Sequence, residues 1–241
     1  MKNKPYQTGL SLIEIMIALL IGAFLLGGVL QIFIGSKQTY RMQENLSRLQ
    51  ENGRLALDFI GRDIRMTSYW GCLARPSGDV FGETVSGISK ITLKAAFVTT
   101  PTGSCGTTVD KTAVYYTDYT STIIYSINNA NAVLHKCCPT NNGAIDLIEG
   151  IENMQILYGE DSNADGWANY YVPANNVVNW EKVVSVRISL LAATLDDNLT
   201  TQPMPYTFNG ITTTTTSTPP VTDRKIRRVF TTTIALRNRL P

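Results

Sequence analysis

Residues 10–34 read LSLIEIMIALLIGAFLLGGVLQIFI, and Glu14 is the one charged residue in this apolar segment. As an α-helix rising about 1.5 Å per residue, the segment reaches about 37 Å, enough to cross a hydrocarbon layer of about 30 Å. It is too long for the core of a signal peptide, and no small-x-small cleavage pattern follows it. We therefore expect a retained membrane-spanning helix, in which a charge at membrane depth costs about 2.5–3.5 kcal/mol.

The helical pattern continues beyond the apolar segment, with no proline between Leu10 and Arg75. An apolar stripe recurs at alternating spacings of four and three residues, through Met42, Leu46, Leu49, Gly53, Ala56 and Ile60. Charged side chains occupy the other faces, so this second half is amphipathic and needs a domain to pack on. The pattern predicts one helix of about 55–60 residues. A coiled coil is the alternative, but the stripe is short and contains glycine.

The rest of the chain has the composition of a β-rich domain. Pro76 and Gly78 end the helical pattern. Residues 183–191, VVSVRISLL, alternate apolar and polar side chains and give the clearest strand prediction. Further strands are predicted at 90–98, 112–118, 121–127, 154–159 and 229–237. The low-complexity segment GITTTTTSTPP at 210–220 is predicted to be a mobile surface loop.

These elements predict an α+β fold, in which a long N-terminal helix packs on a mostly antiparallel β-sheet domain. The expected divisions are a leader, the apolar half of the helix, its amphipathic half and the globular domain, at 1–9, 10–34, 35–72 and 73–241. Lysine and arginine total 21 against 19 acidic residues, so the charge gives no argument for nucleic acid as the main partner. The low charged fraction of 17% suits an exported domain.

All four cysteines follow the apolar segment: Cys72, Cys105, Cys137 and Cys138. An even number of cysteines in an exported domain indicates disulfides. A bond between the adjacent Cys137 and Cys138 would be strained. We therefore expect Cys72 and Cys105 each to pair with one of these two, in either order.

A second candidate site lies in the sequence YGEDSNADGWANYYV. Asp161, Asn163, Asp165 and Gly166 form the D-x-N-x-D-G opening of a calcium loop, and Asn169 stands at its ninth position. The twelfth position is a valine, where an EF-hand needs a bidentate glutamate. The residues therefore predict either a calcium site outside the EF-hand class or a polar turn between strands.

No enzymatic motif stands out. The chain has a single histidine, His135, and contains neither G-x-S-x-G nor H-E-x-x-H. We therefore expect no catalytic activity. The basic run RKIRR at 224–228 is typical of a solvated strand, and its alternative role is contact with a DNA backbone.

The sequence GLSLIEIMIALLIG at 9–22 resembles the processing motif of type IV prepilins and type II secretion pseudopilins. The resemblance implies cleavage after Gly9 by a prepilin peptidase and N-methylation of Leu10. Glu14 then takes the place of the family's assembly glutamate. Leu10 departs from the commoner phenylalanine of the family. Cleavage would leave an amine at membrane depth, and Glu14 of a neighbouring subunit can pair with it. The alternative is that Glu14 reaches the headgroups from the helix end.

Two further segments, 31–72 and 227–241, are similar to minor pilins of the PilW group. The resemblance implies a low-abundance subunit that joins other minor pilins and the major pilin in a tip complex. That complex starts pilus assembly and supports twitching motility and adhesion, with the inner-membrane assembly platform and a tip adhesin as further partners. The implied location is the inner membrane, single-pass with a periplasmic C-terminal domain, and then the pilus tip at the cell surface. The alternatives are a J-type pseudopilin of type II secretion and a tip module that binds DNA or surfaces.

Overall fold

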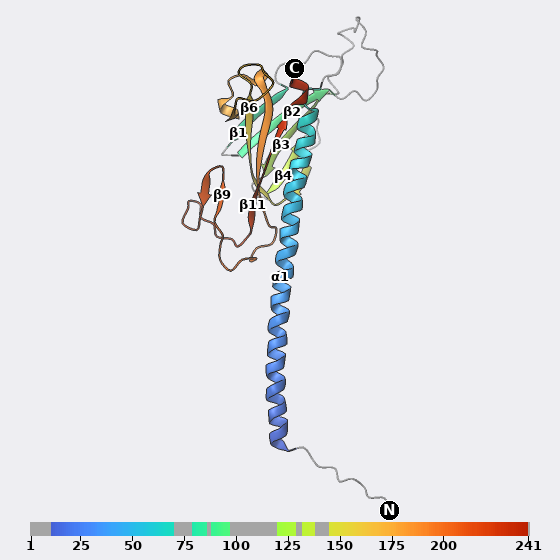
Figure 1. Cartoon of the computed structure of the whole chain (residues 1–241), viewed down its shortest axis with the longest axis vertical. Coiled ribbons are helices and arrows are strands. Elements are labelled where there is room, and N and C mark those ends of the chain that lie inside the picture. Colours follow the sequence, from blue (N-terminus) through green and yellow to red (C-terminus); the bar gives the residue numbers. More distant parts are fainter. Residues whose placement is uncertain are drawn as a thin grey trace, which may run out of the picture. The chain divides into compact units, whose positions relative to one another are not determined.

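The structure is a computed structural model that describes residues 11–69, 79–85, 88–96, 120–128, 132–137 and 145–240. It divides into two compact units, Met1–Glu44 and Asn45–Pro241. Helix α1 (Leu12–Met66) begins in the first unit and ends in the second (Figure 1). Its 55 residues confirm the prediction of one long helix.

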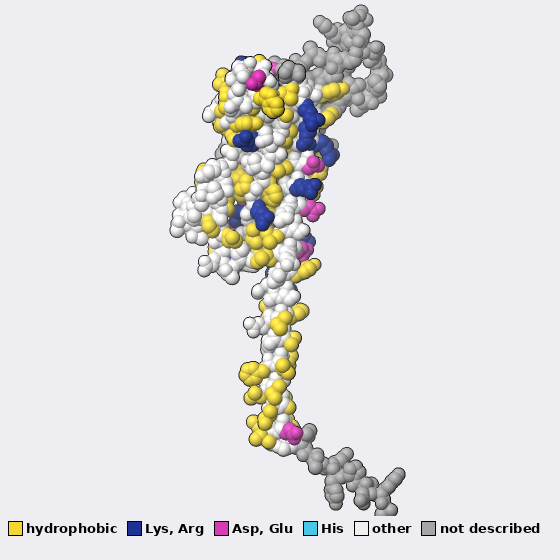
Figure 2. Space-filling view, in the orientation of Figure 1, with side chains coloured by type: hydrophobic (Ala, Val, Ile, Leu, Met, Phe, Trp, Pro, Cys, Tyr) yellow, Lys and Arg dark blue, Asp and Glu magenta, His cyan; other side chains and the backbone are white. Residues whose placement is uncertain are grey.

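Within the first unit, the side chains of α1 are exposed on all sides. Leu12 and Phe24 are each more than three-quarters exposed, and hydrophobic side chains lie along the visible face of this part of the helix (Figure 2). The helix is long and apolar enough to cross a membrane. An apolar surface on every side of a helix is stable only in lipid or among other apolar segments.

The helix ends at Met66, six residues before the end expected from the sequence. Ser68 adopts a left-handed backbone conformation with φ of +65°, which cannot continue an α-helix. The N–H of Thr67 donates to the Asp63 carbonyl, and the N–H of Ser68 donates to the carbonyl of Lys94 on a neighbouring strand. The chain therefore leaves the helix by bonding to the sheet.

The second unit contains two antiparallel sheets and one small hairpin. The first sheet has the strand order β1-β2-β3-β4-β5. Its strands are β1 (Val80–Val85), β2 (Ile88–Ala96), β3 (Thr120–Asn128), β4 (Val133–Cys137) and β5 (Ile145–Glu149).

The second sheet has the order β11-β8-β6-β7. Its strands are β6 (Ile151–Glu160), β7 (Tyr170–Pro173), β8 (Val183–Ala193) and β11 (Arg227–Ala235). The sheets are joined at Gly150, whose φ of +79° permits the sharp turn from β5 into β6.

Short elements complete the unit. They are the 3₁₀ turns η2 (Ala174–Asn176), η3 (Trp180–Lys182) and η4 (Arg237–Arg239), and the hairpin strands β9 (Tyr206–Phe208) and β10 (Ile211–Thr213). The prediction of a mobile loop at 210–220 is wrong at its start, because β10 pairs with β9. Beyond β10, the N–H of Val221 donates to the Thr214 carbonyl and closes a turn.

Five of the six predicted strands coincide with observed strands, and the sixth, 112–118, lies outside the described residues. The alternation predicted for 183–191 is clearest at Val186, Ile188 and Leu190, which are fully buried in β8. The predicted α+β architecture, a long helix on antiparallel sheets, is confirmed.

The core of the second unit lies between α1 and the two sheets. Leu49, Ala56 and Ile60 from the predicted stripe are buried there, together with Ile64. Asn52 Nδ2 donates to the Glu149 carbonyl of the first sheet at 3.2 Å. Further polar bonds to that sheet come from Asp63, whose carboxylate accepts from Tyr125 OH at 2.5 Å and from Lys136 Nζ at 2.6 Å.

Helix α1 approaches the second sheet through its glycines. At Gly53 an added Cβ would overlap the ring of Phe230 on β11. At Gly61 an added Cβ would lie 3.4 Å from the Cδ1 atom of Ile234, which is ordinary contact. Gly53 therefore sets the closest approach of the helix to β11, whereas Gly61 does not.

The C-terminus is fixed by a fully buried ion pair between Arg239 and Asp79. Arg239 also donates to the carbonyls of Trp180 and Val183 and to Ser68 Oγ. These bonds connect η4 to the end of α1, to η3 and to the residue before β1. A buried guanidinium with this many acceptors holds four segments in one arrangement.

We predict that Gly53→Ala destabilises the protein by about 1–3 kcal/mol, because the methyl group overpacks the contact with Phe230. Gly61→Ala is the matched control, and we expect it to be neutral or stabilising, since alanine favours the helix by about 1 kcal/mol. Thermal and denaturant unfolding of the full chain in detergent micelles measures both. Equal effects from the two variants would contradict the close approach at Gly53.

We predict that Arg239→Ala lowers the free energy of unfolding by about 3–5 kcal/mol, because it leaves the Asp79 carboxylate buried without its partner. The control is Arg237→Ala, two residues earlier, where the side chain is exposed and a change within about 0.5 kcal/mol is expected. The same unfolding measurement applies. A loss at position 239 no larger than that at 237 would show that the buried pair is dispensable.

Candidate assembly site

Glu14 lies in the first turn of α1. The carbonyl of Ser11 accepts the N–H groups of Glu14 at 3.1 Å and Ile15 at 3.3 Å, so Ser11 stands at the start of the helix. Ser11-x-x-Glu14 is the spacing of a capping box, and the positive end of the helix dipole favours a carboxylate here. This local role was not predicted from the sequence, although the S-x-x-E pattern was its signal.

The surroundings of Glu14 within the first unit are apolar and exposed. Leu12, Ile13 and Ile15 are each about half or more exposed. No hydrogen bond or ion pair of the Glu14 side chain is found in the part of the chain that the structure describes. The geometry therefore presents one carboxylate on an apolar surface, where a cationic group from another molecule can reach it.

Several predicted site residues lie outside the described residues. They are Gly9, Leu10, Cys72, Cys105 and Cys138, and Cys137 is described in its backbone alone, as the last residue of β4. Cleavage, methylation and the disulfide pairing stay predictions.

The loop between β6 and β7 is organised around the Asp161 carboxylate. Asp161 Oδ1 accepts from the N–H groups of Asn163, Ala164 and Asp165, and Oδ2 accepts from that of Gly166 at 2.8 Å. Burial acts to raise the pKa of Asp161, but these four donors outweigh it and hold the pKa below the ordinary value of an aspartate. The carboxylate therefore stabilises the turn itself.

The remaining candidate calcium ligands also have partners within the loop. Asn163 Nδ2 donates to Asp165 Oδ2 at 2.9 Å, and Asn169 Oδ1 accepts from Ser162 N and Oγ. Among the described residues, no group of three or more histidine, cysteine or acidic side chains is placed to hold a metal. The geometry is that of the polar turn named as the alternative, and calcium binding stays a prediction.

The basic run at 224–228 does not form one patch. The Arg227 guanidinium donates to Glu152 at 2.6 and 2.9 Å and to Asp223 at 2.7 and 2.6 Å, and it stacks over the Tyr206 ring. The bond from Arg227 lowers the pKa of Asp223 below its ordinary range. Arg227 is thus paired with acidic side chains within the fold, whereas Arg228 is exposed.

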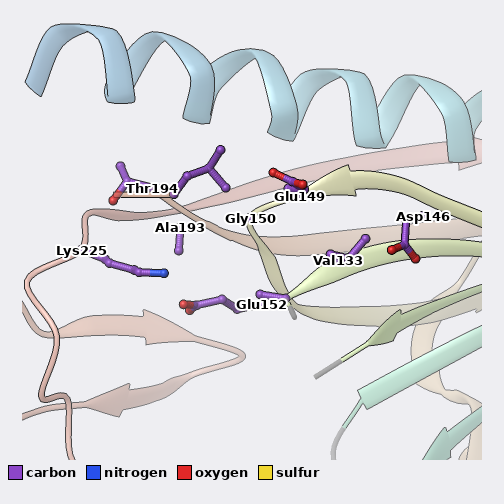
Figure 3. Close-up of a pocket in the computed structure, with 10 residues that line it drawn as sticks. Val133, Asp146, Glu149, Gly150, Glu152, Ala193, Thr194 and Lys225 are labelled. Carbon is purple, nitrogen blue, oxygen red and sulfur yellow. The ribbon is translucent and has the colours of Figure 1, made fainter. Parts of the chain in front are cut away.

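A hollow of about 320 Å³ lies beside the turn from β5 to β6. In Figure 3, Lys225 and Glu152 extend toward each other across it, while Asp146 lies at the far end. Glu152 already pairs with Arg227, and Asp146 Oδ1 lies 2.6 Å from His135 Nε2. Two of the acidic side chains that line the hollow are therefore already paired with other side chains.

Two family models match the chain. Residues 4–30 match the prokaryotic N-terminal methylation motif, and residues 128–238 match the family described as Type IV Pilus-assembly protein W. Over these two segments the chain is similar to type IV pilins of the PilW group. The second match extends well upstream of the predicted C-terminal segment 227–241, but it does not include 31–72, the other segment in which the sequence resembles this group.

No curated protein matches the PilW-like chain. Among solved structures, "Type IV-like pilin TTHA1219 from Thermus thermophilus" is similar, with 13% sequence identity and a TM-score of 0.48. The alignment covers 80% of this chain and 98% of the other.

We predict that Asp161→Asn destabilises the protein at pH 7, because an amide cannot accept all four N–H groups. A depressed folded-state pKa contributes stability above the ordinary aspartate pKa of about 3.9, and that stability is lost as the pH falls through the folded-state value. The difference in stability between wild type and variant should therefore shrink below about pH 4. Unfolding of the full chain between pH 7 and 2 measures this.

Asp165→Asn is the matched control for this titration. Asp165 accepts one backbone N–H, that of Trp167, and an asparagine oxygen can replace it. We expect a smaller loss with little dependence on pH. A pH-independent deficit in Asp161→Asn would contradict the proposed role of the charge.

Proposed function

We propose that this chain is a minor pilin that joins a tip complex and starts assembly of the type IV pilus. The observation that carries the proposal is the exposed apolar part of α1 with Glu14 in its first turn, within the segment that matches the methylation motif. Such a surface requires lipid before assembly and apolar neighbours afterwards.

Processing supplies the partner of Glu14. Cleavage after Gly9 by the prepilin peptidase creates an amine on Leu10, which is then methylated and keeps its positive charge. Paired across two subunits, this amine and the Glu14 carboxylate no longer stand alone in hydrocarbon. Because each charge has one partner, the pair fixes the axial position of one subunit against the next.

The proposed route starts at the inner membrane. The subunit crosses it once, with the second unit in the periplasm, and the assembly platform transfers it to the growing fibre. Other minor pilins and the major pilin are its neighbours there. Twitching motility and adhesion, with a tip adhesin as a further partner, then depend on it through the fibres that it starts.

A role as a DNA receptor receives less support. Arg227, the most buried of the cations in the basic run, is neutralised by Glu152 and Asp223. Fewer free cations are then left for phosphate contacts, which supply the affinity of non-specific DNA binding.

The test is a deletion strain complemented with wild type, Glu14→Ala or Glu14→Gln and scored for surface pili. We expect wild type to restore piliation and both variants to restore less than about a tenth of it, a factor that corresponds to a loss of about 1.4 kcal/mol in subunit addition. Mass spectrometry of the membrane fraction should show cleaved, methylated protein in all three strains. Equal piliation in all strains would contradict the assembly role.

Glu14→Asp provides the matched control, since it keeps the charge on a shorter side chain and should restore piliation partly. Affinity capture of the wild-type chain after cross-linking should yield pilus subunits. Capture of type II secretion pseudopilins instead would assign the chain to a secretion system.

A further inference from the structure

A groove of about 640 Å³ runs between α1 and β11 in the second unit. Its lining includes the half-buried apolar side chains of Leu57 and Phe230, and the buried Ile234. In Figure 1, β11 is the red strand beside the cyan part of α1. The groove is therefore bounded by a helix on one side and by the open edge of a sheet on the other.

The hydrogen-bond register shows which backbone groups of β11 face that edge. At one end, Thr194 N donates to the Ile226 carbonyl, and at the other, Leu236 N donates to the Val184 carbonyl. In an antiparallel ladder, hydrogen-bonded pairs alternate with pairs that face away. Even-numbered residues of β11 therefore bond to β8, and the N–H and C=O groups of Val229, Thr231 and Thr233 point away from it.

No backbone partner of Val229, Thr231 or Thr233 is found in the described part of the chain. β11 is also long for an open edge, with nine residues and no proline. By contrast, β7 at the opposite edge of the same sheet has four residues and ends in Pro173. A long strand edge rich in β-branched residues is a template for another strand.

The rim of the groove is cationic. Arg54 and Arg65 from α1 and Arg228 from β11 are all exposed and line it. Asp58, the acidic residue in the lining, pairs with Arg62 at 3.4 Å. No side-chain ion pair or hydrogen bond of Arg54, Arg65 or Arg228 is found among the described residues. The rim thus presents three positive charges beside a free strand edge.

We propose that this groove binds an extended, acidic segment of a partner protein, which adds to β11 as a fifth strand of the sheet. Backbone bonds to Val229, Thr231 and Thr233 hold the segment, and carboxylates on the face turned toward α1 meet the rim arginines. A second copy of β11 fits less well, because it brings a second Arg228 to a rim that is already positive. This binding concerns the second unit and does not depend on cleavage after Gly9 or on Glu14.

The test measures binding of a fluorescent nine-residue peptide, TETETETET, to the full-length protein in detergent micelles by anisotropy. We expect saturable binding that weakens as salt is raised. The matched peptide TKTKTKTKT should not bind. A third peptide has the sequence TETETETET, but every second backbone nitrogen, the set that faces β11, is methylated. This peptide keeps its charge but cannot donate the hydrogen bonds to the strand, and it should also fail to bind.

Protein variants test the same two contributions. Arg54→Glu with Arg228→Glu should weaken binding by about tenfold or more, whereas Arg237→Glu, an exposed arginine outside the groove, should not. Thr231→Pro removes an N–H that β8 does not use, and it should abolish binding. Thr231→Val keeps that N–H and should bind as wild type does. Melting temperatures establish that each variant is folded.

Three outcomes would overturn the proposal. Equal binding of the N-methylated peptide would show attraction by charge alone, without strand addition. Equal binding of the lysine peptide would remove the role of the rim. A dimer of the full chain that is lost in Thr231→Pro would show that the edge serves a second copy instead.

Discussion

The packing of α1 on two sheets at once is the contact on which the second unit depends. One face of the helix, from Leu49 to Ile64, is buried, and it contacts the first sheet through Asn52 and Asp63 and the second through Gly53. Each buried leucine or isoleucine of this face contributes about 1.5–3 kcal/mol. The sheets also meet directly, because Ser89 Oγ on β2 accepts the N–H of Ile156 on β6. The helix covers the part of the core that the contact between the two sheets leaves uncovered.

The sequence predicted the elements governed by local periodicity. The stripe from Leu49 to Ile60 recurs with the helical period, and β8 alternates with the period of a strand, so each could be inferred without knowledge of its partners. The N-terminal processing motif could be recognised just as directly, because the residues that define it lie close together in the chain.

Features that depend on distant partners could not be predicted. Asn45 is buried although it is polar, because it bonds to Asp196, 151 residues away. In the sequence, Arg227 is part of a basic run, but in the fold it forms an ion pair with Glu152. The helix stops at Met66 because Ser68 bonds to β2, a contact with no local signature. The strand edge of β11 likewise follows from sheet order, which periodicity does not specify.

The two units of the chain thus present different surfaces for assembly. The first carries an apolar helix with one carboxylate, suited to neighbours in a hydrocarbon-like environment. The second carries a sheet domain whose C-terminus is fixed by Arg239 and whose β11 edge is open. Separate surfaces allow the fibre contact and the partner contact to change independently.

The most direct test of the account is photo-cross-linking in cells from a photoreactive amino acid at the exposed position 13, which leaves the neighbouring Glu14 in place. If Glu14 lies against the amine created by cleavage, the cross-linked peptides will begin at the N-terminal residue of a processed pilin. That product should disappear when pilin cleavage is blocked. Cross-links to lipid alone, or the same products with and without cleavage, would contradict the account.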